Sequence, residues 1–144
     1  MKYWDSSALV PLCVEETSSA RLIRLYRSDP AVVTWWGSEI ECVSALARLE
    51  REGAMTEAMI STALDRLGAL RLAWHEVQPS RALRDTAVRL LRVHALRAPD
   101  AIQLSSALIA ADREPGALEF VCLDARLASA ARREGFTVAG LNAG

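Results

Sequence analysis

The stretch MKYWDSSALV, from Met1 to Val10, decides the fold. The bulky residues Lys2 to Trp4 favour a short strand, and this run stops at an acid, Asp5. Two serines and the helix-forming residues Ala8 to Val10 follow. In open α/β sheets, ligands bind at the C-terminal ends of the strands, because helix N-termini gather there. Further acids at the same edge would therefore turn Asp5 into part of a site.

Composition favours a single globular domain. The chain has 144 residues, of which 51% are hydrophobic, and this is ample for one core. No apolar run reaches the roughly 18 residues that a membrane span needs, and no basic segment leads into an apolar one at the N-terminus. We expect a cytoplasmic protein without a membrane segment.

Cysteine and histidine do not form a metal-binding pattern. Cys13, Cys42 and Cys122 are odd in number, far apart and set among apolar neighbours, which is typical of reduced packing residues. His75 and His94 have no partner at zinc-ligand spacing. Any metal is therefore expected to be hard and bound by oxygen.

Charge gives a weak signal. A net charge of −1 argues against a protein that coats nucleic acid through bulk positive charge. If four of the 18 acids held a metal, however, 17 bases would face 14 acids, a balance of +3. All of these bases except Lys2 are arginine, the side chain that grips phosphate bidentately, although genome composition explains arginine abundance equally well.

Hydrophobic periodicity alternates between strands and helices along the chain. Strands are expected at residues 2–4, 31–35, 72–77, 118–123 and 136–139. Helices are expected at 18–27 with Thr17 as cap, at 37–52, 56–70 and 80–96, from Asp100 after a break at Pro99, and at 124–134. This alternation predicts a three-layer α/β/α sandwich, with a central parallel sheet of about five strands in one domain, 1–144.

Four acids share one kind of position. Asp5 and Asp124 lie where a strand gives way to a helix, Asp100 lies where a break gives way to one, and Glu41 lies in the first turn of its helix. With right-handed crossovers, such positions fall along the same edge of a parallel sheet. The four carboxylates are therefore expected to converge.

Helix capping is the alternative explanation for three of these acids. Asp100 and Asp124 could be N-caps, and Ser38 with Glu41 has the S-x-x-E form of a capping box. Asp5 would be partly buried at the end of a central strand and would need a partner. Two carboxylates about 4 Å apart repel by about 4 kcal/mol at an effective dielectric constant near 20, so a converging cluster needs a cation. Mg²⁺ and Mn²⁺ both prefer carboxylate and water oxygens.

Four blocks of the sequence carry a family resemblance. They are YWDSSALV, SEIECVSALARLEREG, LRAPDAIQLSSAL and FVCLDARLASAARREGF, in this order. Together they resemble PIN domains, and most of all the VapC-type toxins of toxin–antitoxin pairs. The match spans nearly the whole chain.

The resemblance implies a Mg²⁺- or Mn²⁺-dependent endoribonuclease that cuts RNA and is neutralised by a cognate antitoxin. It implies that the catalytic and metal-binding acids are the four already named: Asp5, Glu41, Asp100 and Asp124. Ser7 matches the hydroxyl residue that helps to orient the cluster. Arg48 matches a basic residue that could balance the negative charge of the carboxylates. Alternatively, it could form an ion pair with Glu52, four residues further along the helix.

Two positions depart from the family pattern. Cys122 stands where many relatives have Thr or Ser, and a thiol makes a poorer hydrogen bond to a metal-bound water or phosphate. Trp4 is larger than the small apolar residue often found before the first acid, which bears on packing rather than chemistry.

Partners follow from the same resemblance. A homodimer is implied, for which Ile40, Val43, Met59 and Ile60 could line the surface, although core burial would explain most of them. RNA could approach over Arg97 and Arg126, the arginines nearest to the acids in sequence, with solvated surface charge as the alternative.

Other functions are either excluded or left open. The chain has no Gly-rich phosphate loop and no recognisable catalytic triad. A catalytically silent PIN-like module that binds RNA or protein stays open, and so does a structure-specific DNA nuclease.

Overall fold

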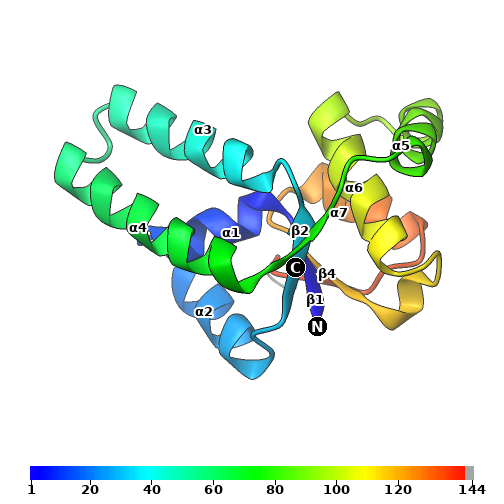
Figure 1. The fold of residues 1–144 in the computed structure, drawn as a ribbon, viewed down its shortest axis with the longest axis horizontal. Coiled ribbons are helices and arrows are strands. Elements are labelled where there is room, and N and C mark those ends of the chain that lie inside the picture. Colours follow the sequence, from blue (N-terminus) through cyan, green and yellow to red (C-terminus); the bar gives the residue numbers. More distant parts are fainter. Residues whose placement is uncertain (142–144) are drawn as a thin grey trace.

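The computed structural model describes residues 1–141, which fold around an all-parallel sheet with strand order β3-β2-β1-β4-β5 (Figure 1). The strands are β1 (Lys2–Trp4), β2 (Val32–Trp35), β3 (His75–Val77), β4 (Glu119–Val121) and β5 (Val138–Ala139). The three-layer sandwich with a five-stranded parallel sheet is therefore confirmed. The central strand is β1, as the opening stretch predicts.

Helices connect the strands and cover both faces of the sheet. They are α1 (Ser6–Cys13), α2 (Ser19–Ser28), α3 (Ser38–Arg51), α4 (Glu57–Ala73), α5 (Arg81–Val93), α6 (Ala98–Ala110) and α7 (Ala125–Arg133), with a 3-10 turn η1 (Pro115–Ala117) before β4. None of the described helices is long and apolar enough to cross a membrane.

Side-chain alternation along β1 divides the core into two halves. Tyr3 packs on the face covered by α5, α6 and α7, where its ring stacks on Phe120 at 5.3 Å between centroids. Trp4 points to the other face and packs among residues of α1 to α4. Both rings are fully buried, so the large residue before Asp5 is accommodated in the core. The three cysteines are buried and free, as predicted.

Several predicted boundaries of helices and strands differ from the structure. The predicted break at Pro99 does not occur, because proline is tolerated in the first helical turn and α6 already begins at Ala98. Thr17 is not the cap of α2, whose N-cap is Ser18. The third strand is shorter than predicted, because α4 continues to Ala73 and leaves only His75–Val77 to pair with β2.

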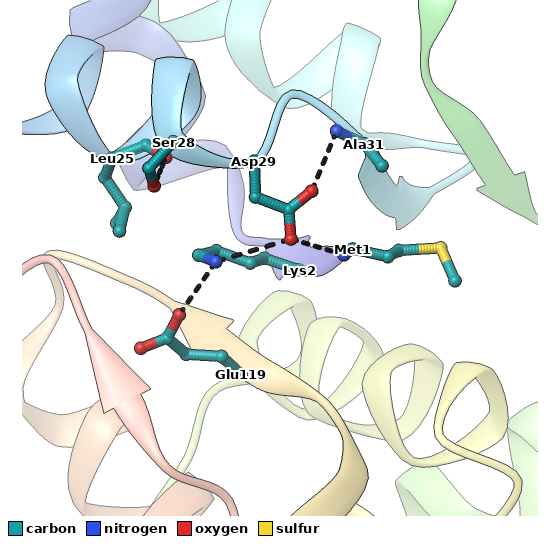
Figure 2. A network of polar contacts seen from close by, with 7 residues as sticks. All are labelled: Met1, Lys2, Leu25, Ser28, Asp29, Ala31 and Glu119. Carbon is teal, nitrogen blue, oxygen red and sulfur yellow. Dashed lines mark hydrogen bonds and ion pairs between the residues drawn. The ribbon is translucent and has the colours of Figure 1, made fainter.

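The charges at the N-terminal edge of the sheet are paired with each other (Figure 2). Asp29, which ends α2, accepts hydrogen bonds from the N-terminal ammonium of Met1 and from Lys2 Nζ, the latter at 3.4 Å. Lys2 Nζ also lies 3.3 Å from a Glu119 carboxylate oxygen on β4. These pairs tie the start of β1 to both of its neighbours. The C-terminal edge of the same strands is different, because acids gather there.

Candidate active site

A pocket of about 290 Å³ lies where β1 and β4 end. Its walls contain all four carboxylates that the sequence singles out, together with hydroxyl and guanidinium groups: Asp5, Glu41, Asp100, Asp124, Ser6, Ser7, Ser44, Arg48 and Arg97, with Val10, Ala45 and Pro99. The predicted convergence of the acids is therefore present in the structure, although the segments that carry them lie far apart in the sequence.

Asp5 is the most deeply buried acid of the pocket, with 4% of its surface exposed. Its backbone N–H donates to Val121 O of β4, and its Oδ2 accepts from the Ser7 backbone N–H at 3.1 Å and from Ser7 Oγ at 2.5 Å. Burial raises the pKa of Asp5 to about 6, against the opposing effect of the Ser7 hydrogen bonds, and the charge of Asp100 raises it further. The partner that burial requires is thus Ser7.

Ser7, at the start of α1, links the segments that follow β1 and β4. While its Oγ donates to Asp5, it also accepts from the backbone N–H of Leu123 at 3.0 Å. The hydroxyl therefore fixes the Asp5 carboxylate relative to the loop that follows β4 and carries Asp124.

Glu41 is held by a residue that sequence reasoning missed. Gln103 of α6 donates from Nε2 to Glu41 Oε2 and, at 3.0 Å, to Ser38 Oγ, while its Oε1 accepts from the Tyr3 hydroxyl at 2.7 Å. Gln103 is 1% exposed. The available signal was a single amide in the apolar helix AIQLSSALIA, three residues after Asp100 and so on the same helical face.

The capping-box alternative for Ser38 and Glu41 is wrong. The N-cap of α3 is Gly37, without a side-chain capping bond. Ser38 Oγ lies 2.6 Å from Thr34 Oγ1 instead, and the Glu41 carboxylate reaches Gln103. Burial raises the pKa of Glu41 to about 7, the Gln103 hydrogen bond opposes this shift, and the charges of Asp5 and Asp100 add to it.

The capping alternative is wrong for Asp100 and correct for Asp124. Asp100 lies inside the first turn of α6, whose N-cap is Arg97, and its carboxylate faces Arg97 Nε at 3.7 Å. Asp124 does cap α7, since its Oδ1 accepts from the Leu127 backbone N–H at 2.8 Å, yet it also lines the pocket. Asp124 therefore caps α7 and lines the acidic pocket at the same time.

Cys122 supports the loop rather than the pocket surface. Its thiol is fully buried, and Sγ accepts from the Asp124 backbone N–H at 3.2 Å. Ser7 Oγ lies 3.9 Å from the same sulfur. Where many relatives have Thr or Ser, the Cys122 thiol therefore makes part-buried hydrogen bonds to the Asp124 backbone and to Ser7, the residue that holds Asp5.

Arg48 lines the acidic pocket. The ion pairs found among residues 1–141 do not include the alternative pairing of Arg48 with Glu52. With Arg97, it places two guanidinium groups at the rim of a pocket that holds four carboxylates.

The donor set fits a hard divalent cation. All four acids offer carboxylate oxygens, which Mg²⁺ and Mn²⁺ prefer, and burial raises the pKa of Asp5 to about 6 and that of Glu41 to about 7. Among residues 1–141, however, no group of three or more His, Cys, Asp or Glu side chains is arranged, as it stands, to hold a metal ion. The type of donor atom in the pocket therefore suits Mg²⁺ or Mn²⁺, whereas the described carboxylates do not lie close enough together to coordinate one ion as they stand.

Comparison with known proteins gives relatives that match almost the full length of the chain. No family model matches the chain. It is 33% identical over 137 residues to Ribonuclease VapC45 of Mycobacterium tuberculosis (strain CDC 1551 / Oshkosh) and to Ribonuclease VapC49 of Mycobacterium tuberculosis (strain ATCC 25618 / H37Rv). Each match covers 95% of this chain and 93% of the relative. With this identity, the parallel sheet and the acidic pocket at its edge, the chain belongs to the VapC family of PIN-domain toxins.

Proposed function

We propose that the protein is a Mg²⁺- or Mn²⁺-dependent endoribonuclease toxin that hydrolyses phosphodiester bonds of RNA. The observation that carries the proposal is the gathering of Asp5, Glu41, Asp100 and Asp124 in one pocket that also contains Arg48 and Arg97. The name of the two relatives, ribonuclease, supports RNA as the substrate class.

The residues divide into three roles. The four carboxylates would hold one or two cations, with Ser7 orienting Asp5 and Gln103 orienting Glu41. Arg48 and Arg97 would contact the negatively charged phosphate at the rim. When bound, the cation lowers the pKa of a water molecule and neutralises charge that develops on the phosphate.

The reaction needs no protein nucleophile. Water adds to phosphorus in line with the leaving 3′ oxygen and releases a proton to solvent, the P–O3′ bond breaks, and the 3′ oxygen takes up a proton from solvent. The products are a 5′-phosphate and a 3′-hydroxyl. The carboxylates alone would repel the phosphate, so they would assist this reaction through the cation that they hold.

We also infer the partners of a VapC toxin: a cognate antitoxin, and a second copy of the chain, with the single domain acting in the cytoplasm. Ile40, Val43 and Met59 lie exposed on α3 and α4, with 63%, 40% and 50% of their surface accessible, and they support a dimer surface there. Ile60 does not belong to such a surface, because it is buried in the core.

The experiment is cleavage of matched RNA and DNA oligonucleotides by purified protein with Mg²⁺, with Mn²⁺ and with chelator. We expect metal-dependent cleavage of RNA that Asp5→Asn and Asp100→Asn each abolish. Asp65→Asn is the matched control, because Asp65 is an exposed acid on α4 outside the pocket. Unchanged RNA cleavage in Asp5→Asn would refute the proposal, and preferential cleavage of DNA would reassign the substrate.

A further inference from the structure

Two further cavities continue from the acidic pocket along the surface. The pocket shares Arg97, Asp100 and Asp124 with a cavity of about 460 Å³, which Arg126 also lines. Arg126 in turn lines a cavity of about 240 Å³ beside α7. A chain that leaves the acids can therefore follow one connected surface, with Arg126 at the junction.

The last cavity, here called the α7 groove, has a polar wall from one helix. It is lined by His94, Ala95, Leu96, Arg126, Ser129, Ala130 and Arg133. Arg126, Ser129 and Arg133 follow one another at spacings of three and four residues, so they share a face of α7. All three are exposed. Seven residues separate the two arginines, which is about 10 Å along the helix axis.

The positive charge of this face is not cancelled by the neighbouring acid. Both carboxylate oxygens of Glu134 are occupied, by the Arg89 guanidinium at 3.1 and 2.8 Å and by His94 Nε2 at 2.7 Å. Arg126 and Arg133 take part in none of the ion pairs found within residues 1–141. Two unpaired guanidinium groups therefore line the groove, although the protein as a whole carries a net charge of −1.

We propose that Arg126, Ser129 and Arg133 form a phosphodiester-binding subsite that holds the RNA backbone next to the segment in the acidic pocket. This inference rests on the proposed ribonuclease function and names the surface that carries the flanking part of the substrate. Guanidinium groups recognise phosphate oxygens through charge-assisted hydrogen bonds, and the Ser129 hydroxyl adds a donor. Contacts of this kind position the chain and are independent of base sequence.

The test measures binding without cleavage. A fluorescein-labelled single-stranded oligouridylate is titrated with the full-length protein in chelator-containing buffer, and its polarisation is followed at several salt concentrations. We expect Arg126→Gln/Arg133→Gln to raise Kd roughly tenfold, since two exposed charge contacts are lost. The slope of log Kd against log salt should fall by about 1.4, the value for two phosphate contacts on a single strand.

Two controls separate the groove from bulk charge. Arg24→Gln/Arg27→Gln removes the same two charges from exposed positions of α2, which packs on the other face of the sheet. Arg132→Gln removes an exposed charge from α7 itself, at a residue that does not line the groove. Both variants should bind the oligouridylate as the unmodified protein does.

Three results would overturn the proposal. They are absence of oligouridylate binding by the unmodified protein, equal weakening by the groove and α2 variants, and equally tight binding of polyglutamate through the same two arginines. The last would assign the groove to an acidic peptide. Failure of metal-dependent cleavage would instead count against the proposed function, because binding in chelator does not depend on the reaction.

Discussion

Gln103 of α6 donates a hydrogen bond to the Glu41 carboxylate of α3, and its other amide atom accepts from Tyr3 of β1. One uncharged side chain thus joins three segments behind the acidic pocket. Because Gln103 and Tyr3 are both buried, neither can exchange its partner for water. The position of Glu41 therefore depends on a residue that carries no charge.

Gln103→Leu should destabilise the fold as well as disturb the site. The substitution leaves the buried Tyr3 hydroxyl without its acceptor and Glu41 without its donor, and each such loss costs roughly 1–3 kcal/mol. We expect the free energy of unfolding in urea to fall by about 3 kcal/mol. Gln78→Leu, at an exposed position, should change it by less than about 0.5 kcal/mol. Equal changes in the two variants would show that the network does not stabilise the protein.

The metal-free protein should lose stability as the pH rises. The pKa of Asp5 is raised to about 6 and that of Glu41 to about 7 in the folded state, whereas unfolded carboxyls titrate near about 4. The folded state then binds more protons than the unfolded state in this window. The stabilisation is complete below about pH 4 and is lost as the pH rises to about 7.

Urea unfolding in chelator at a series of pH values measures this dependence. Asp5→Asn should flatten the curve and raise stability at the alkaline end, because the buried charge is gone. An increase in the stability of the unmodified protein between about pH 5 and pH 8 would contradict the account.

Ser7→Ala should loosen Asp5. It removes the hydroxyl that donates to Asp5 Oδ2 and leaves the Leu123 N–H without its acceptor, at a cost of about 2 kcal/mol in unfolding free energy. The pKa of Asp5 should rise further, since the Ser7 hydrogen bond opposes the effect of burial. Carbon NMR of the Asp5 carboxyl measures the shift, and Ser7→Thr, which retains a hydroxyl, should restore the lower value. A titration that is identical in the alanine variant would be inconsistent with this role.

Arg48→Gln should affect substrate and leave the fold intact. Because Arg48 lines the acidic pocket and makes no ion pair with Glu52 in the described part of the chain, the free energy of unfolding should change by less than about 0.5 kcal/mol. We expect kcat/KM for RNA to fall roughly tenfold, with Arg51→Gln, an exposed change on the same helix, as the control. Equal kcat/KM in both variants would show that Arg48 is an ordinary surface charge that does not contact the substrate.

The sequence predicts the fold and the members of the pocket well, because strand-ending acids in a parallel sheet share an edge. Asp5 and Asp124 follow from that rule, and Asp100 and Glu41 follow from their places in the first turns of α6 and α3. The residues at which helices begin are predicted less accurately than the helices themselves. Pro99 reads as a break although it sits within the first turn of α6.

What the sequence does not give are the partners of buried polar groups. Gln103 lies 62 residues from Glu41 and 100 from Tyr3, and only the crossing of α6 behind β1 brings them together. Ser38 and Glu41 have the spacing of a capping box, but their side chains form hydrogen bonds with Thr34 and Gln103 instead. Local patterns list possible bonds, and tertiary packing decides among them.

Calorimetric titration of Mn²⁺ into chelator-treated protein tests the central claim, that the four acids form a metal site. We predict saturable binding that Asp5→Asn and Asp100→Asn each weaken at least tenfold, roughly the loss of one close charge contact. Asp65→Asn, an exposed acid on α4, should bind as the unmodified protein does. Absence of saturable binding by the unmodified protein, or equal affinity in all variants, would contradict the account.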